Sequence, residues 1–350
     1  MTDQKQFERK SAMRTIKRVV PYLWPAGRSD IKLRVVLAMV ALVLSRFASV
    51  LTPFFFKGAI DSMSPELTSD PTIMLVTGTI GLVLAYGAFR LLSVGLTQIR
   101  GAFFARVGQR ALRTLALETF QHIHALSLRY HITRKTGGLS RIIERGVKGV
   151  EFLLRFMLFS IVPLILELAM VGIIFFVLFD ARYLAVIVVT ISLYVWFTFR
   201  VTEWRVQIRK EMNKQDTDAN QKAIDSLLNY ETVKYFSAEE REATRYDSSM
   251  LQYEKYAVQT EYTLGFLNFG QSVLITGGLV AVMILAAMGV QDGTLTVGDF
   301  VMVNAYMIQI TMPLNFLGTV YREIRQALVD MGEMFDLLDQ PAEISNKPNA

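Results

Sequence analysis

Polar side chains recur at helical spacing inside otherwise apolar stretches of this 350-residue chain. Three groups stand out: Tyr194, Thr198, Thr202, Arg205 and Arg209; Asn268, Gln271 and Ser272; and Asn304, Ile308, Thr311, Asn315, Gly318 and Arg322. Intervals of three and four residues place the members of a group on one face of a helix. Arginines one turn apart, such as Arg205 and Arg209, can each hold a carboxylate through two hydrogen bonds, and amides suit peptide groups. This chemistry indicates a small, anionic, peptide-like ligand.

Other chemically active residues are few. The chain has no cysteine and three histidines, and His122 and His124 are two positions apart, so they point to different faces of a helix. We therefore predict no metal site and no catalytic residue. Arg46, Arg90 and Glu167 lie deep in apolar stretches, where they form either a structural ion pair or triad or, for Glu167, a proton relay.

The elements that carry these residues are long and apolar. Hydrophobic residues make up 52% of the chain and charged residues 19%, which argues against an ordinary soluble enzyme. Six windows are long enough to cross a bilayer as helices, and no alternating strand pattern appears. They are residues 35–56, 72–99, 152–179, 183–199, 264–288 and 297–320. We predict an all-α membrane protein with six long transmembrane helices.

Lysine and arginine indicate the orientation of these helices. Residues 1–34 carry nine, 100–150 ten and 200–262 ten, whereas 57–71, 180–182 and 289–296 carry one, one and none. By the positive-inside rule, both termini and the two long loops are cytoplasmic. Most of the arginines and amides of the three groups then lie near the inner-leaflet level, where they can face one cavity open to the cytoplasm: Arg205, Arg209, Asn268, Gln271, Asn315 and Arg322. The alternative is that the arginines only reach the lipid headgroups.

The two long loops lack proline and have helical spacing, so we expect helices that project far into the cytoplasm. A helix from 72 to about 130 would be about 85 Å long, and Gly137 and Gly138 would break the helix at the hairpin tip. The expected domains are a cytoplasmic N-terminus with an interfacial elbow helix (1–34), a six-helix transmembrane domain (35–325) with cytoplasmic hairpins at 100–150 and 200–262, and a linker (326–350).

Two of the cytoplasmic segments carry a family resemblance, LSLRYHITRKTGGLSRIIERG (126–146) and LLNYETVKYFSAEEREATRY (227–246). Both resemble the coupling regions of ATP-binding-cassette (ABC) exporters with six-helix membrane domains, in particular the ATM-type and heavy-metal-tolerance half-transporters. Further matches are SVLTPFFFKGAID (49–61), GFLNFGQ (265–271) and PLNFLGTVYREIRQALVDMGEMFDLLD (313–339). The resemblance covers nearly all of residues 15–345.

The resemblance implies a domain-swapped homodimer whose spans enclose one translocation cavity for glutathione, glutathione disulfide or glutathione–metal conjugates. It implies ligand contacts at Tyr194, Arg205, Arg209, Asn268, Gln271, Asn315, Gly318 and Arg322. It implies coupling to an ATPase through His131, Arg134, Thr136, Gly137, Tyr230, Glu231, Lys234 and Tyr235.

Members of this family carry a nucleotide-binding domain, with ATP and Mg²⁺, after the membrane domain, but this chain has no G-x-x-x-x-G-K-[ST] loop. We expect a truncated membrane domain without a cofactor of its own, which hydrolyses ATP only if the full-length protein carries that domain. Expected partners are the bilayer, a second copy, the nucleotide-binding domain and a glutathione-type ligand, and no nucleic acid. We expect the bacterial inner membrane, ahead of the mitochondrial inner membrane.

The resulting hypothesis is export of glutathione derivatives from the cytoplasm by alternating access. One alternative is an ABC exporter of lipid or hydrophobic drugs, which requires an apolar cavity. A second is a secondary transporter driven by an ion gradient, with Glu167 as its coupling carboxylate. A third is a membrane scaffold. The polar stripes argue against the first and third alternatives, and the long cytoplasmic helices argue against the second.

Overall fold

The computed structural model describes residues 15, 17–63, 78–133, 136–314 and 317–341, and the elements in this part of the chain are helices. In chain order they are α2 (Ser29–Asp61), α4 (Ile80–Ala125), α5 (Leu128–Thr133), α6 (Thr136–Phe156), the π-helix η3 (Met157–Ile161), α7 (Val162–Leu178), α8 (Ala181–Leu228), α9 (Tyr230–Tyr235), α10 (Glu239–Gln291), α11 (Val297–Leu314) and α12 (Leu317–Leu338). The chain divides into two compact units, which are described separately: unit 1 is 1–180 with 285–350, and unit 2 is 181–284.

Five helices of the described residues are long and apolar enough to cross a membrane: 29–61, 80–125, 139–178, 181–228 and 239–291. They correspond to the first five predicted spans. The sixth, 297–320, corresponds to α11 and the first residues of α12, with 315–316 outside the described residues. The helix α11, which carries Asp299, Asn304 and Gln309, is not among these five, and the sixth span stays a prediction.

The long helices that were predicted are present, with different ends. The helices α4, α8 and α10 have 46, 48 and 53 residues, which corresponds to about 69, 72 and 80 Å. The first ends at Ala125 and not near residue 130, because Leu126 has an extended backbone and packs into a small buried cluster. The predicted helix break at Gly137 and Gly138 is wrong. They lie in the first turn of α6, where backbone N–H groups have no intrahelical partner.

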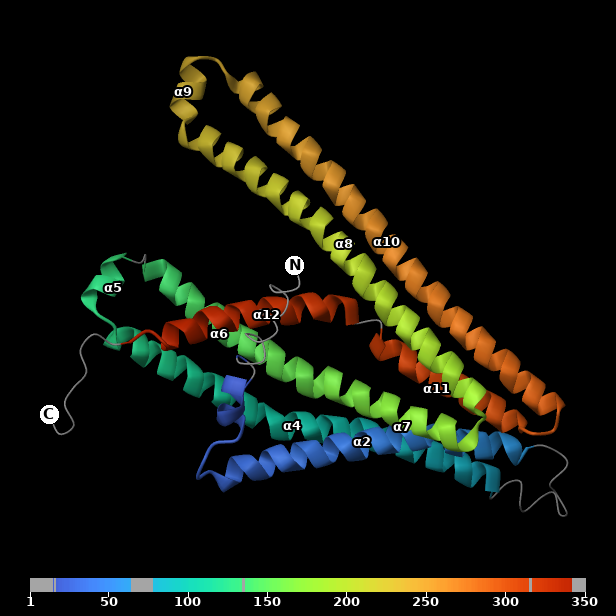
Figure 1. The fold of residues 1–350 in the computed structure, drawn as a ribbon. Coiled ribbons are helices and arrows are strands. Elements are labelled where there is room, and N and C mark those ends of the chain that lie inside the picture. Colours follow the sequence, from blue (N-terminus) through green and yellow to red (C-terminus); the bar gives the residue numbers. More distant parts are fainter. Residues whose placement is uncertain (1–14, 16, 64–77, 134–135, 315–316, 342–350) are drawn as a thin grey trace. The chain divides into compact units, whose positions relative to one another are not determined.

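Unit 1 has a core shared by helices that are far apart in the sequence. The helix α2 packs along α4 and also contacts α7 and α11, and α6 packs along α12 (Figure 1). A large buried cluster draws residues from α2, α4, α6, α12 and the N-terminal segment. Within it Val107, Leu115 and Met334 have almost no exposed surface. The helices α2, α4, α6 and α12 are therefore held against each other by apolar packing.

The N-terminal segment is tied to this core by polar contacts. Residues 17–23 are helical, as expected for the elbow helix. Arg18 donates to both carboxylate oxygens of Asp339, over 2.7 and 2.5 Å. Tyr22 Oη donates to Glu118 Oε2 over 2.6 Å, and burial together with that carboxylate raises the pKa of Tyr22. The exposed side chain of Val20 fits an interfacial helix, whose place at the membrane surface stays a prediction.

The helices α6 and α12 approach each other closely at Gly149. A Cβ atom here would lie 2.9 Å from the carbonyl oxygen of Ala327 and 3.2 Å from Met331 Cγ. Gly149→Val is therefore expected to lower the free energy of unfolding by about 1–3 kcal/mol through overpacking, which thermal unfolding measures. Gly332→Ala on α12 is the control, because no atom lies within 4 Å of its Cβ position. Equal melting temperatures for the two variants would contradict the close approach.

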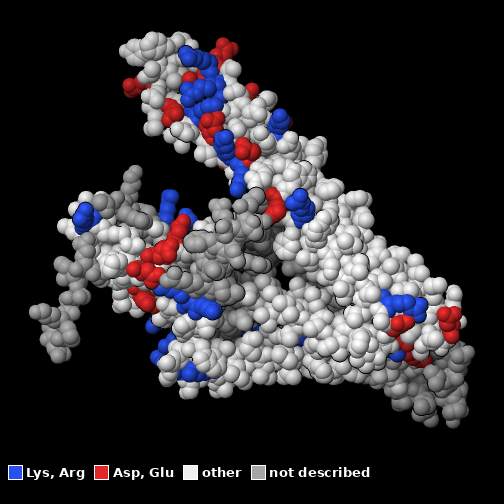
Figure 2. Space-filling model, in the orientation of Figure 1, with Lys and Arg blue, Asp and Glu red and all other residues white. Residues whose placement is uncertain are grey.

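Unit 2 is a hairpin of α8 and α10 with α9 at its tip (Figure 1). The two long helices meet along one seam in antiparallel register: Thr190 with Gly278, Phe197 with Gly270, Thr198 with Gln271, Arg205 with Thr263, and Asp218 with Ser249. A Cβ atom on either glycine would clash with the facing side chain, so glycine permits the close approach. Figure 2 shows charged side chains gathered over the α9 half of the hairpin, beside a stretch without charge.

Candidate functional site

Most of the predicted ligand-binding residues lie on the hairpin of unit 2. They are Tyr194, Arg205 and Arg209 on α8 and Asn268 and Gln271 on α10. The antiparallel register of the two helices brings them to one stretch of the hairpin. Gln271 Nε2 donates to Thr198 Oγ1 over 2.9 Å, and Arg205 Nε donates to Thr263 Oγ1 over 3.4 Å. The structure thus brings together this part of the predicted set.

Burial separates these residues into two roles. Tyr194 is fully buried and Gln271 is 7% exposed, so both belong to the seam between the helices. Arg205 is half-buried, and Arg209 and Asn268 are exposed. Arg209 follows Arg205 by one turn, and Asn268 precedes Gln271 by nearly one turn, so each exposed residue borders the seam. Of the predicted ligand residues on the hairpin, Arg205, Arg209 and Asn268 are therefore the ones with exposed surface, and their contact with a ligand stays a prediction.

This surface carries positive charge next to a neutral amide. The nearest acidic residues along α8, Glu203 and Glu211, are each two positions from one of the arginines. Residues two positions apart lie on opposite sides of a helix, so these carboxylates are directed away from the arginine face. Two guanidinium groups one turn apart can each take a carboxylate in a bidentate pair. The arrangement suits a ligand with two carboxylates and peptide groups between them.

The remaining three predicted ligand residues belong to unit 1. Gly318 and Arg322 lie in the first two turns of α12, and their side chains lie outside the described residues, as does all of Asn315. Their position next to the arginines of α8 stays a prediction.

The sequence prediction missed the hydroxyl partners of the seam. Thr263 accepts from Arg205, and Thr260 Oγ1 lies 3.8 Å from Met212 Sδ. A signal was present, because Thr260, Thr263, Leu267 and Gln271 recur at intervals of three and four residues and are all buried. The buried members of the α8 stripe contribute to helix packing, and the role of the stripe as a cavity lining stays a prediction.

The predicted coupling residues lie at two helix turns. On α9, Tyr230 and Tyr235 are strongly exposed, and Lys234 Nζ pairs with Glu239 Oε1 at 2.7 Å, a contact that raises the pKa of Lys234. Glu231 is also exposed. At the other turn, His131 Nε2 donates to the carbonyl oxygen of Ile123 over 3.0 Å and so ties α5 to the end of α4.

The other members of the first coupling segment are described only in part. Arg134 lies outside the described residues. Thr136 and Gly137 begin α6, and their side chains are not described. The role of both segments in coupling stays a prediction.

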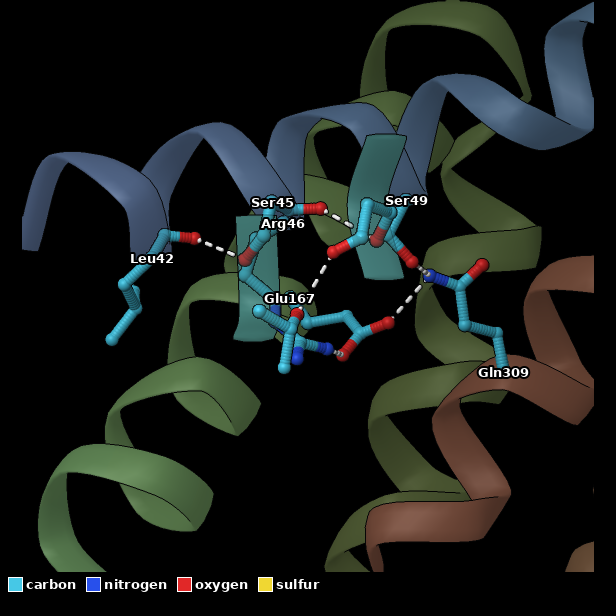
Figure 3. A network of polar contacts seen from close by, with 8 residues as sticks. Leu42, Ser45, Arg46, Ser49, Glu167 and Gln309 are labelled. Atoms are coloured by element: carbon cyan, nitrogen blue, oxygen red, sulfur yellow. Dashed lines mark hydrogen bonds and ion pairs between the residues drawn. The ribbon is translucent and has the colours of Figure 1, made fainter. Parts of the chain in front are cut away.

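A second polar cluster lies inside unit 1 (Figure 3). Arg46 Nη1 on α2 donates to Glu167 Oε2 on α7 over 3.0 Å, and only 5% of the Glu167 side chain is exposed. Gln309 on α11 donates to the other carboxylate oxygen and to Ser49 Oγ, the latter over 2.9 Å. The predicted ion pair is therefore present, and it joins three helices. Because both carboxylate oxygens accept hydrogen bonds, the geometry supports a structural role over a proton relay.

Arg90 does not join Arg46 and Glu167, so the predicted triad of these three residues is wrong. Arg90 is exposed on α4, where Nη1 donates to Tyr86 Oη over 2.9 Å. The third partner of Glu167 is the amide of Gln309, which belongs to a predicted span more than a hundred positions away. As to metal binding, the described residues contain no cluster of three histidine, aspartate or glutamate side chains suited to an ion.

Comparison with known proteins gives consistent similarities. Residues 35–314 match the model of the ABC transporter transmembrane region. The chain is 44% identical over 334 residues to the mitochondrial iron-sulfur clusters transporter ABCB7 of Danio rerio, covering 94% of this chain and 45% of that protein. It is 42% identical over 342 residues to the ATM1-type heavy metal exporter of Novosphingobium aromaticivorans, covering 98% of this chain and 56% of that protein.

The fold is similar to that of a solved structure. A bacterial Atm1-family ABC exporter with ATP bound matches with a TM-score of 0.67 and 41% sequence identity, over 91% of this chain and 55% of that chain. The chain thus spans about half the length of the curated relatives that it matches.

Proposed function

The chain belongs to the family of ABC transporter transmembrane regions, and on that premise we propose that it is the membrane domain of an ATP-driven exporter of glutathione derivatives. The observation that carries the proposal is the pair of arginines on α8, with Asn268 across the seam on α10. Glutathione and its disulfide carry carboxylates joined by peptide groups, which match guanidinium and amide donors. A hydrophobic drug offers too few acceptors for this surface, and a phospholipid offers a phosphate to the arginines but no peptide groups for the amide.

The names of the relatives fit a shared type of cargo. One is named for iron–sulfur clusters and another for heavy metals. Both cargoes contain soft metals, which prefer thiolate ligands. This chain has no cysteine, so it offers no thiolate of its own to a soft metal. A glutathione–metal conjugate supplies that thiolate together with the carboxylates for Arg205 and Arg209.

The proposed assembly is a homodimer in which the hairpins exchange between the two copies. Residues 181–284 form a compact unit of their own, which is the kind of element that domain swapping exchanges. We expect each chain to bind a nucleotide-binding domain through α9 and through the segment near His131. The exposed aromatic rings of Tyr230 and Tyr235 suit that contact.

The protein is a multi-pass membrane protein, and we propose the bacterial inner membrane as its location, with both termini cytoplasmic. Alternating access then follows. Closure of the nucleotide-binding domains on ATP pushes the hairpin tips, and the long helices carry the motion to the arginines. A ligand shifts this equilibrium only through different affinities for the two states.

That requirement is testable. In the full-length protein, glutathione disulfide is expected to bind at least about tenfold tighter in the nucleotide-free inward-open state than in the ATP-trapped outward-open state, a difference of about 1.4 kcal/mol. Isothermal titration of both states measures the two dissociation constants. Equal dissociation constants in the two states would contradict the proposed mechanism. Saturable binding of a hydrophobic drug in place of glutathione disulfide would contradict the proposed cargo.

A further inference from the structure

A cavity of about 300 Å³ lies within unit 1, between α4 on one side and α6 with the π-helix η3 on the other. Sites for small ligands measure about 300–1,000 Å³. The apolar part of its lining includes Phe104 and Leu112 from α4, Leu154 from α6 and Phe159 from η3. The cavity is partly open to the outside, so it has room for a ligand headgroup together with a short stretch of hydrocarbon.

Two opposite charges border this cavity. Glu151 and Arg155 belong to its lining, lie one turn apart on α6 and are exposed. Glutamate four residues before a basic residue is the order that favours an ion pair within a helix. Among the described residues, however, neither side chain has an ion-pair or hydrogen-bond partner. Both charges are therefore available to a ligand that itself carries a cation and an anion.

The apolar and charged parts of the cavity follow one another along α6 and η3. The rings of Phe104 and Phe159 pack edge to face with centroids 5.6 Å apart, and a Cβ atom on Gly101 would lie 3.8 Å from the same Phe159 ring. In the orientation proposed above, α6 runs from the cytoplasm into the membrane. Arg155 then lies about 6 Å deeper than Glu151, and Phe159 lies deeper still. Ammonium, phosphate and acyl chain follow in this order in a cytoplasmic-leaflet phosphatidylethanolamine.

We propose that this cavity binds phosphatidylethanolamine of the cytoplasmic leaflet. Glu151 accepts hydrogen bonds from the ammonium, Arg155 donates to the phosphate, and the two phenylalanine rings contact the start of an acyl chain. Phosphatidylglycerol has no cation for Glu151, and the quaternary ammonium of phosphatidylcholine has no N–H to donate. The proposal rests on the proposed orientation in the membrane and is independent of the transported cargo.

The test is native mass spectrometry of the full-length protein titrated with phosphatidylethanolamine, with Glu151→Gln/Arg155→Gln as the variant. The matched control is Glu144→Gln/Lys148→Gln, which removes the same charges at the same spacing from α6 but outside the cavity. We expect the variant to bind this lipid at least about tenfold more weakly than wild type, because it loses charge-assisted hydrogen bonds. The control is expected to bind it as wild type does.

Gly108→Leu tests the cavity without changing a charge. A Cβ atom on Gly108 would lie 3.5 Å from the Phe104 ring, an ordinary contact, and the rest of the leucine side chain would occupy the cavity that Gly108 lines. This variant is also expected to lose the lipid. If it does not fold, the charge variant alone decides the question.

The ligands of the titration separate the possible occupants. Wild-type protein is expected to bind phosphatidylethanolamine more tightly than phosphatidylcholine or phosphatidylglycerol. Equal binding of the three lipids, or equal binding of phosphatidylethanolamine by wild type and the charge variant, would overturn the proposal. Soluble phosphoethanolamine that binds as tightly as the lipid would keep the headgroup site and overturn the lipid as its source. Loss of the dimer in Gly108→Leu with unchanged lipid binding would assign the cavity to a second copy of the chain and overturn the proposal.

Discussion

Glu167→Ala is expected to lower the free energy of unfolding by about 3–5 kcal/mol, because it leaves the guanidinium of Arg46 without its buried counter-ion. The Arg46–Glu167 contact is 3.0 Å long, and the two side chains are 21% and 5% exposed. Gln309 loses an acceptor in the same substitution. Since these groups come from α2, α7 and α11, the loss affects the packing of three helices at once.

Thermal unfolding in detergent, with activity-independent detection, measures this effect. Arg90→Ala is the matched control, because Arg90 is an exposed arginine of the same apolar region. The double variant Arg46→Met/Glu167→Leu removes both charges together and should recover much of the stability, since no unpaired charge remains. If Glu167→Ala and Arg90→Ala have the same melting temperature, Glu167 does not stabilise the fold, and the proton-relay alternative gains support.

Arg205→Ala/Arg209→Ala is expected to weaken the binding of glutathione disulfide by about two orders of magnitude or more. Hydrogen bonds to charged groups contribute about 1.5–3 kcal/mol each, and about 1.4 kcal/mol is a factor of ten. Binding to the full-length protein in nanodiscs measures the loss. Arg205 also donates to Thr263, so the melting temperature of the variant is recorded beside its affinity.

The chain offers a closely matched control for this variant. Lys210 and Lys214 are likewise one turn apart on α8, and both are exposed. Lys210→Ala/Lys214→Ala removes the same charge at the same spacing but from another face of the helix. It should retain the wild-type affinity. An equal loss in both double variants would show that overall charge, not this face, attracts the ligand.

The fold was largely predictable because membrane spans are set by local composition. Long apolar windows indicated five helices that the structure contains. Ends of helices were less predictable. The end of α4 at Ala125 depends on the burial of Leu126 against residues far along the chain, which no local pattern reveals.

The site was predictable only as faces of helices. Spacing placed Arg205, Arg209 and Gln271 on stripes, but it did not tell which stripe residues would pack against the facing helix. The same limit explains why Arg90 was grouped with Glu167 and Gln309 was not. Both are polar residues in apolar windows, and only the arrangement of α2, α7 and α11 distinguishes them.

ATP-dependent uptake of glutathione disulfide by the full-length protein in proteoliposomes tests the central claim most directly. The vesicles are expected to accumulate the disulfide only with ATP and Mg²⁺. Accumulation should be lost in Arg205→Ala/Arg209→Ala and kept in Lys210→Ala/Lys214→Ala. Vesicles that hydrolyse ATP but accumulate no more glutathione disulfide or glutathione–metal conjugate than protein-free vesicles would contradict the account.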